Sequence, residues 1–255
     1  MTQLKPEVSV ITVVKNDSAG LEKTLHSLLA QSFTNWECLI ISAFSEDETK
    51  EVANQLAKRD SRINHYNEKS PGIYQSMNHG IELAEGAYAV FMNAGDVFAN
   101  PNAIGILHNE ILEGNYSVVV GGYSTGDKEY SFNPRKFGPN RFSLNRRWGC
   151  HQSMIFKLVE IKYVKGFSEQ YKLASDFEVV LKLVCKKPGK RISEVVARVD
   201  PNGISNTQIG IVLKEKQKIR REFFGRFTLN LLLGKIWTYL VSGKICLRLF
   251  FAKLT

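Results

Sequence analysis

Polar side chains that could bind a ligand follow three apolar runs of the sequence. Lys15 to Asp17 come after VSVITVV (8–14), Ser42 to Asp47 begin at the end of WECLIIS (36–42), and Asn93 to Asp96 begin at the end of YAVFMN (88–93). Runs of this kind are typical of buried strands. Ligands bind beyond the carboxyl ends of parallel strands, where loops and helix N-termini offer unpaired N–H groups. We therefore expect the three polar segments to lie around one binding site.

Helical segments separate these strands. Leucines recur at helical spacing over residues 19–30, and Asp17 or Ser18 is placed to cap the free N–H groups. Ser45 and Glu48 have the spacing of a capping box, which predicts a second helix through about residue 59. Alternation of strands and helices indicates an α/β fold with a mostly parallel, Rossmann-like central sheet flanked by helices.

The alternation continues along the chain with one irregular stretch. A short strand near His65, a helix over residues 74–84 and another near 101–112 are predicted, followed by the strand SVVVGGY. The segment from Ser124 to Gly149 is irregular, and long loops of this kind usually serve a site. ASDFEVVLKLVCKK then predicts a helix and RISEVVARVD a strand, before PNGISN closes the globular part.

The composition indicates one large domain with an appendage. The chain has 255 residues, of which 44% are hydrophobic and 23% charged, enough for one substantial core. Its start lacks the features of a secretory signal, and its four cysteines form no C-x-x-C pair, so we expect a reduced, cytoplasmic protein. KNDSAG follows the first strand in place of G-x-G-x-x-G, which argues against a dehydrogenase.

Positive charge is concentrated at the C-terminal end. The formal net charge is +9, and the ten Lys or Arg and two Glu from Lys214 to Thr255 account for 10 − 2 = +8 of it. A local excess predicts an electrostatic contact, with an anionic membrane or with RNA. No module that reads nucleic acid is recognisable in the sequence, so we expect no nucleic acid partner.

The same segment is typical of a helix that lies in a membrane interface. An apolar face is formed by Leu213, Ile219, Phe223, Phe224, Phe227 and Leu231. Farther on, Lys235, Lys244 and Arg248 interrupt the apolar sequence, so no run approaches the roughly 20 residues that span a bilayer. We expect residues 207–255 to form a helical, basic amphipathic tail, peripheral on the inner face of the plasma membrane through residues 214–255. The alternative is packing on its own domain or in a homodimer.

Seven motifs, in order, resemble those of family 2 glycosyltransferases. They are VSVITVVKND, LEKTLHSLLAQSF, WECLIIS, SPGIYQSMNHGIELAEGAYAVFMNAGD, HQSMIF, ASDFEVVLKL and NGIS. The pattern is similar to the bacterial branch that builds capsule, exopolysaccharide and O-antigen chains. The resemblance implies a GT-A fold over residues 1–206 that binds a nucleoside diphosphate sugar and a divalent metal, Mg²⁺ or Mn²⁺. It also implies transfer of the sugar, with inversion, to a hydroxyl of a saccharide acceptor, and a membrane-bound tail would suit a lipid-linked one.

The resemblance assigns roles to two acidic residues. Asp96 matches the last acidic residue of the family's D-x-D type motif, whose carboxylate holds the cation against the diphosphate. Capping of a turn is the alternative for Asp96. Asp176 matches the catalytic base that removes a proton from the acceptor hydroxyl. Ser175 and Glu178 have the spacing of a capping box, which leaves Asp176 for chemistry and not only for starting a helix.

Further positions match the family's binding motifs. His151 and Gln152 match an H-Q pair that should lie on the acceptor or diphosphate side, together with Glu178, although His151 could also be an ordinary buried, hydrogen-bonded His. Gly72 lets backbone approach the ligand, and Asn78 can donate to ribose or phosphate. The residues expected to bind the nucleotide sugar are Thr12, Val13, Lys15, Asn16, Ser42, Asp47, Gly72, Asn78, Asn93, Ala94 and Gly95.

The sequence departs from the family pattern at several positions. Ser42 replaces the Asp that commonly contacts the base, Ser70 and Gln75 stand where relatives often carry Asp, and Asn93 stands where many have Asp. Asp47 falls at an Asp position of the family but equally suits the first turn of a helix. These differences keep a second function open, that of a non-catalytic sugar-nucleotide-binding or scaffold protein of the same fold.

Overall fold

The computed structural model describes residues 5–143, 149–203 and 207–225. The strands are β1 (Val8–Val14), β2 (Trp36–Ser42), β3 (Ile63–Asn67), β4 (Tyr88–Phe91), β5 (Val97–Phe98), β6 (Val118–Thr125), β7 (Lys128–Tyr130), β8 (Arg135–Phe137), β9 (Met154–Lys157) and β10 (Gly189–Val199). The helices are α1 (Ser18–Leu29), α2 (Thr49–Arg59), α3 (Ile73–Leu83), α4 (Ala103–Glu113), α5 (Asn140–Ser143), the 3-10 helix η1 (His151–Ser153), α6 (Leu158–Tyr163), α7 (Ser175–Lys186) and α9 (Ile209–Phe224).

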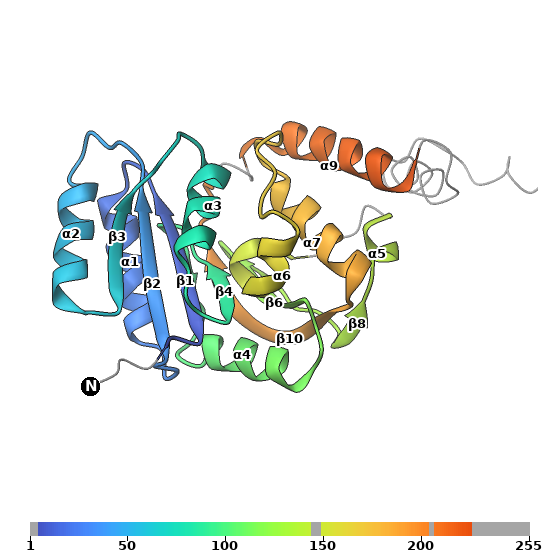
Figure 1. Cartoon of the computed structure of the whole chain (residues 1–255), viewed down its shortest axis with the longest axis horizontal. Helices are drawn as coiled ribbons and strands as arrows, with labels where there is room; N and C mark the ends of the chain where they lie inside the picture. Colours follow the sequence, from blue (N-terminus) through green and yellow to red (C-terminus); the bar gives the residue numbers. More distant parts are fainter. Residues whose placement is uncertain (1–4, 144–148, 204–206, 226–255) are drawn as a thin grey trace, which may run out of the picture.

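The strands of the described ranges form one mixed sheet (Figure 1). Its order is β3-β2-β1-β4-β9-β6-β10-β5, with β7 paired to β6 and β8 paired to β10. The strands β3, β2, β1 and β4 are parallel to one another, as predicted. β9 is antiparallel to both of its neighbours, β4 and β6, and β6 and β10 are parallel again. The second half of the sheet is therefore less regular than the sequence pattern indicated.

Two hydrophobic cores cover the two faces of the sheet. In β1, Val10 and Val14 belong to the core under α1, α2 and α4, whereas Ile11 and Val13 belong to the core under α3, α6 and α7. Successive side chains of a strand point to opposite faces, so a strand covered on both sides is apolar at almost every position. This explains the continuous apolar run of the first predicted strand.

Helix α3 packs closely against β1. A Cβ on Gly80 would lie 2.5 Å from Ile11 Cγ2, so glycine is needed for this approach. Just after the helix, the buried Glu37 carboxylate accepts hydrogen bonds from Ser9 Oγ at 2.6 Å and from the Glu85 N–H at 2.8 Å. These contacts fix α3 along the sheet and hold its N-terminus at the carboxyl edge of β1.

The helix starts agree only partly with the predicted caps. Asp17 caps α1, since its Oδ1 accepts a hydrogen bond from the Gly20 N–H at 2.9 Å, as expected. The predicted capping box of Ser45 and Glu48 is wrong. Ser45 Oγ accepts the Asn16 N–H at 3.0 Å instead, and Glu48, at the N-cap position of α2, makes no capping side-chain hydrogen bond within the described residues.

Helix α9 packs on the domain. Ile219 is fully buried in the same core as Phe177, and Phe224 packs partly against that core. Arg220 Nε also donates a hydrogen bond to the Phe142 carbonyl at 2.8 Å. The expectation that Ile219 and Phe224 face a membrane is therefore wrong, because both side chains face the protein.

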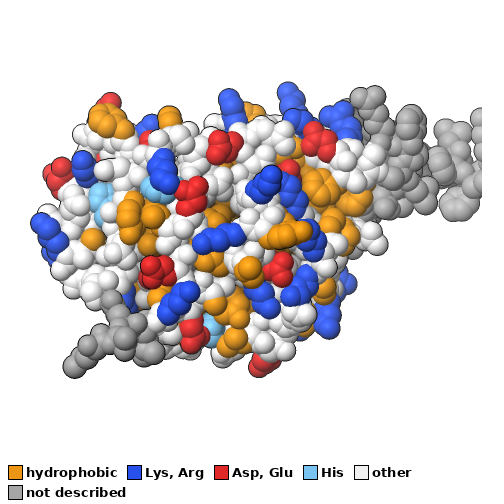
Figure 2. All heavy atoms as spheres, in the orientation of Figure 1, with side chains coloured by type: hydrophobic (Ala, Val, Ile, Leu, Met, Phe, Trp, Pro, Cys, Tyr) orange, Lys and Arg blue, Asp and Glu red, His pale blue; other side chains and the backbone are white. Residues whose placement is uncertain are grey.

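The outer side of α9 is basic and partly apolar. Lys214, Lys218 and Arg221 are exposed, and Figure 2 shows Lys and Arg side chains at the surface over this helix. Leu213 and Phe223 are 47% and 37% exposed. The other residues of the predicted apolar face, Phe227 and Leu231, and the basic positions Lys235, Lys244 and Arg248 lie outside the described residues. Within the described ranges, no helix is both long and apolar enough to cross a bilayer.

The docking of α9 can be tested at its buried isoleucine. Ile219→Ala should lower the free energy of unfolding by about 2–5 kcal/mol, because it removes a fully buried side chain. Ile211→Ala, on the exposed side of the same helix, should change it by less than about 0.5 kcal/mol. Urea unfolding monitored by circular dichroism measures both, and equal stabilities of the two variants would contradict the packing.

Candidate active site

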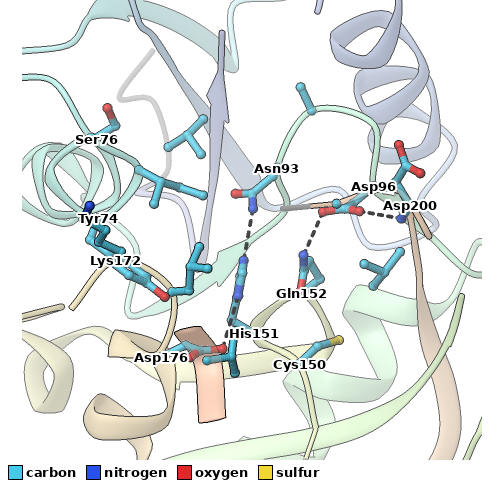
Figure 3. Close-up of a pocket in the computed structure, with 18 of the residues that line it drawn as sticks. Tyr74, Ser76, Asn93, Asp96, Cys150, His151, Gln152, Lys172, Asp176 and Asp200 are labelled. Atoms are coloured by element: carbon cyan, nitrogen blue, oxygen red, sulfur yellow. Dashed lines mark hydrogen bonds and ion pairs between the residues drawn. The ribbon is translucent and has the colours of Figure 1, made fainter. Parts of the chain in front are cut away.

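A cavity of about 890 Å³ opens at the carboxyl edge of the parallel strands. Its walls come from the ends of β1 and β10, the segment after β4, η1, and the starts of α3 and α7 (Figure 3), together with α9. Polar and charged residues that line it include Lys15, Asp17, Asn93, Asp96, His151, Gln152, Lys172, Asp176, Asp200, Lys216 and Arg220. Two of the three predicted polar segments, Lys15 to Asp17 and Asn93 to Asp96, thus meet here. The segment from Ser42 to Asp47 contributes only Ala43.

Two consecutive side chains connect Asp96 and Asp176 across the cavity (Figure 3). Gln152 Nε2 donates a hydrogen bond to Asp96 Oδ2 at 2.8 Å, and His151 Nδ1 lies 3.6 Å from Asp176 Oδ2. The other ring nitrogen of His151, Nε2, is 3.1 Å from Asn93 Nδ2. With this amide nitrogen donating, Nε2 of a neutral ring accepts, and the ring proton is on Nδ1, facing Asp176.

Asp96 is a buried acid held by two donors. Its side chain follows a tight turn in which Gly95 has a φ of +89°, and the residue is 5% exposed. Oδ1 accepts the Asp200 N–H at 2.9 Å while Oδ2 accepts from Gln152. Burial raises the pKa of the Asp96 carboxyl above its ordinary value, and these two hydrogen bonds oppose that rise only in part. The negative charge of Asp200 adds to the rise.

Asp176 lies in the first turn of α7. Its Oδ1 accepts the Phe177 N–H at 2.7 Å, and Oδ2 is directed toward His151. The predicted capping box is wrong, because Ser175 Oγ has no hydrogen-bond partner among the described residues and Glu178 pairs with Lys182 at 2.9 Å. Asp176 therefore takes part in the helix start and still presents one oxygen to the cavity.

The start of α3 forms another wall. Gly72 precedes the helix with a φ of +135°, a conformation that favours glycine, and lines the cavity together with Tyr74. Val13, Lys15 and Ala94 line it from the side of β1. The N–H groups of a first helical turn have no partner within the helix and attract anions. This wall therefore combines an apolar surface with donors suited to phosphate groups.

Four of the expected binding residues serve the structure around the cavity and do not line it. Thr12 is buried in β1, with its Oγ1 4.0 Å from Cys38 Sγ. Asn16 Oδ1 accepts the Glu46 N–H at 2.8 Å, and Asp47 Oδ2 accepts the Ser18 N–H at 3.4 Å, so these side chains connect two loops. Gly95 forms the turn that precedes Asp96. The residues in question are Thr12, Asn16, Asp47 and Gly95.

Asn78 and Glu178 also lie away from the cavity. The Asn78 side chain donates to the Phe167 carbonyl and accepts its N–H, each at 2.8 Å, so its amide joins α3 to the loop after α6. The expected contact of Asn78 with ribose or phosphate is therefore wrong for this arrangement. Glu178 is buried and paired with Lys182 on the same helix, which removes it from the acceptor side.

The Ser42 hydroxyl forms a hydrogen bond with a histidine. Its Oγ lies 2.7 Å from His65 Nε2, and His65 Nδ1 lies 2.8 Å from Asn54 Oδ1. This resembles the order of groups in a hydrolase triad, but Ser42 is only 2% exposed and does not line the cavity. The hydroxyl therefore cannot meet a substrate, and the arrangement joins β2, β3 and α2.

Several lining residues were not predicted from the sequence. Asp200 follows β10, so the rule that ligands lie beyond strand ends could have found it. Lys172 lies in the loop before α7, and Lys216 and Arg220 come from α9, a helix that the sequence placed outside the domain. No sequence pattern marks these three side chains, and the packing of α9 on the domain is what brings Lys216 and Arg220 to the cavity.

Comparisons with known proteins identify the family of the chain. The family model described as Glycosyl transferase family 2 matches residues 9–158. TuaG of Bacillus subtilis (strain 168), which carries the name of a teichuronic acid biosynthesis glycosyltransferase, is 39% identical over 97 residues, 38% of this chain and 38% of TuaG. The matched stretches span 38%, 17% and 40% of the lengths of three curated relatives, TuaG among them.

Solved structures share the fold. TarS 1–349 of S. aureus in complex with UDP-GlcNAc has a TM-score of 0.68 and 16% identity, covering 94% of this chain and 76% of that one. The mannosyltransferase PcManGT from Pyrobaculum calidifontis, in complex with GDP-Man and Mn²⁺, has a TM-score of 0.69 and 14% identity, covering 94% and 72%. The predicted GT-A fold is confirmed.

The buried carboxyl predicts a pH-dependent stability. A raised pKa in the folded state means that the protonated carboxyl favours folding, and this contribution is lost as the pH rises through the raised pKa. Asp96 accepts two hydrogen bonds, and the asparagine amide can accept only one of them, a loss that does not depend on pH. The melting temperature of the wild type relative to Asp96→Asn should therefore fall as the pH rises from about 4 to about 7, by roughly 2–4 °C for about 1 kcal/mol at this size. Scanning calorimetry measures this difference, and a difference that stays the same across this range would contradict the raised pKa.

Proposed function

The chain belongs to glycosyl transferase family 2, and from this premise we propose that it moves a sugar from a nucleoside diphosphate sugar to a hydroxyl of a saccharide acceptor, with inversion at the anomeric carbon. The observation that supports this most is that Asp96 and Asp176 line one cavity and are connected through the adjacent side chains Gln152 and His151. A cation site and a base on opposite sides of one reacting carbon are what such a displacement needs. We propose a role in the synthesis of a cell-surface polysaccharide.

In the proposed reaction, Asp176 acts as the general base. Its Oδ2 takes the proton of the acceptor hydroxyl, whose oxygen forms a bond to the anomeric carbon as the bond from that carbon to the diphosphate breaks. The diphosphate leaves with the electron pair on the opposite side. The Nδ1–H of His151 orients the carboxylate. General-base help of this kind typically contributes about 10² to 10⁴ in rate.

The surroundings of Asp96 suit a hard divalent cation. The Asp17 and Asp200 carboxylates both approach Gly95, at 3.5 Å and 3.8 Å from the position that a Cβ would take there. Asn93 Oδ1 is buried without a hydrogen-bond partner among the described residues. The described residues contain no group of three or more His, Cys, Asp and Glu placed to hold a metal. Mg²⁺ usually takes only one or two carboxylates, with substrate phosphates completing the shell.

We therefore propose that Asp96, together with Asp200, holds Mg²⁺ or Mn²⁺. When bound, the cation neutralises charge on the leaving diphosphate as a Lewis acid. The residues that we propose to contact the nucleotide sugar are Val13, Lys15, Gly72, Asn93 and Ala94, all of which line the cavity. The same Asp96→Asn variant should lose any stabilisation that Mn²⁺ adds to the donor complex in a thermal-shift measurement.

The proposed base is tested by a matched pair of variants. Asp176→Asn should reduce sugar transfer by at least about 10²-fold while the affinity for the donor stays within about twofold, because the amide cannot accept a proton. Asp60→Asn serves as the control, since Asp60 pairs with Arg62 before β3, at the opposite edge of the sheet. Transfer is measured with radiolabelled donors. Donor binding without turnover by the wild type would instead favour the non-catalytic binder.

We further propose that the basic C-terminal segment, residues 214–255, lies on the cytoplasmic surface of the plasma membrane, where the acceptor is a lipid-linked saccharide. The support is the charge of +8 in this segment and the exposure of Ile209 and Phe223 on α9. Each basic residue near an anionic surface is worth about 1 kcal/mol. Confinement to the surface would raise the concentration of enzyme near such an acceptor.

Sedimentation with vesicles tests this attachment. The full chain should bind vesicles of phosphatidylglycerol, release at high salt because the attraction is screened, and leave pure phosphatidylcholine vesicles mostly unbound. Absence of binding to anionic vesicles at low salt would exclude the proposal. A dimer in light scattering, combined with that absence, would favour the homodimer.

A further inference from the structure

The carboxylate of Glu215, on α9, binds three consecutive backbone N–H groups of another segment. Its Oε1 accepts the Lys172 N–H at 2.8 Å, and its Oε2 accepts the Leu173 N–H at 2.9 Å and the Ala174 N–H at 3.0 Å. Hydrogen bonds from N–H groups to a charged acceptor are roughly twice as strong as neutral ones. Both oxygens of one side chain therefore hold one short stretch of backbone.

That stretch leads directly into the helix that carries the proposed base. α7 begins at Ser175, and Asp176 is its second residue. The N-cap residue Ala174 has no side chain that could cap the helix, and the first N–H groups of a helix need an acceptor and favour negative charge. Glu215 supplies an acceptor for the N–H of this N-cap residue from a distant part of the sequence. Its other two bonds hold Lys172 and Leu173, the two residues before the cap.

Helix α9 is anchored firmly enough to hold Glu215 in place. Ile219, one turn farther along the helix, is fully buried in the core that contains Phe177. At the end of α9, Glu222 Oε2 accepts a hydrogen bond from Tyr171 OH at 2.6 Å, beside the segment that Glu215 binds. Helix α9 and the segment that leads into α7 are thus joined by backbone, side-chain and apolar contacts.

The same helix forms part of the cavity. Val212, Leu213, Lys216 and Arg220 line it, whereas Glu215 does not and is occupied by the three backbone bonds. Glu215 therefore acts on the site only through the backbone next to Asp176.

We propose that Glu215 is a positioning residue for Asp176, and that α9 is consequently a required part of the acceptor side of the active site. The proposal rests on the proposed function, because it assigns Glu215 a role through the general base. Displacement of a reacting group by about 1 Å can reduce a rate by about 10²-fold. Loss of the carboxylate should therefore slow the transfer step and leave donor binding unchanged.

The test compares three side chains at position 215 in the full chain. Glu215→Ala, which removes all three bonds, should lower kcat by about 10- to 100-fold with the KM for the donor within about twofold of wild type. Glu215→Gln retains one oxygen, which can accept two of the three N–H groups, and should be intermediate. Glu222→Gln is the control, since the amide oxygen can still accept from Tyr171, and its kcat should equal that of wild type.

A wild-type kcat for Glu215→Ala, or an equal fall for Glu222→Gln, would overturn the proposal. A fall in both kcat and donor affinity would also overturn it, because it would indicate general loss of structure. If Glu215→Ala does not fold, as judged by its melting curve, the same comparison is made with Glu215→Gln.

Hydrogen exchange gives a readout that is independent of turnover. The amides of residues 172–174 should exchange faster in Glu215→Gln than in wild type and remain protected in Glu222→Gln, since only the former loses acceptors for them. Unchanged exchange in Glu215→Gln would overturn the proposed positioning. An inactive wild type with the expected exchange pattern would instead count against the proposed function alone.

Discussion

The candidate active site depends on one dipeptide that contacts two acids from different parts of the fold. Asp96 follows the parallel half of the sheet, whereas Asp176 belongs to a helix on the face opposite α1 and α4. His151 and Gln152 lie between them in η1, and neighbouring side chains point in different directions, so one contacts each acid. Gly149, at a φ of +131°, and the buried Ser153 fix the short helix at its two ends. A shift of this segment would therefore change the positions of both carboxylates together.

The environment of Asp96 is unfavourable for a charged carboxylate. A carboxylate removed from water next to a second carboxylate has a raised pKa, and hydrogen bonds from a backbone N–H and an amide compensate only partly. Nearby, Asn93 has a buried oxygen with no partner within the described ranges. Unsatisfied oxygens and uncompensated negative charge are a common signature of a place built to receive a positive ligand.

Local patterns predicted the parts of the molecule that local interactions determine. The strands β1, β2 and β4, the Asp17 cap and the placement of Asp96 beyond a strand end follow from apolar runs and from the geometry of parallel sheets. The cavity positions of Asp176, His151 and Gln152 were expected only through family resemblance. Contacts between distant segments could not be predicted. Examples are the contact of Ser42 with His65 and the binding of the backbone before α7 by Glu215. The apolar face of α9 was assigned to a membrane because a sequence does not tell which surface covers a hydrophobic residue.

The mixed order of the sheet has a consequence for the time at which the two acids reach their positions. The strands of the half that ends in Asp96 all come from residues 8–91, with β1 paired to both β2 and β4. The other half is complete only after β10 has paired with β5, β6 and β8, which lie far earlier in the chain. It also needs α9 to bind the segment that precedes α7. During synthesis, the N-terminal strands emerge from the ribosome first. In a nascent chain, the wall that carries Asp96 is therefore made first, and Asp176 comes into position only after α9 has left the exit tunnel.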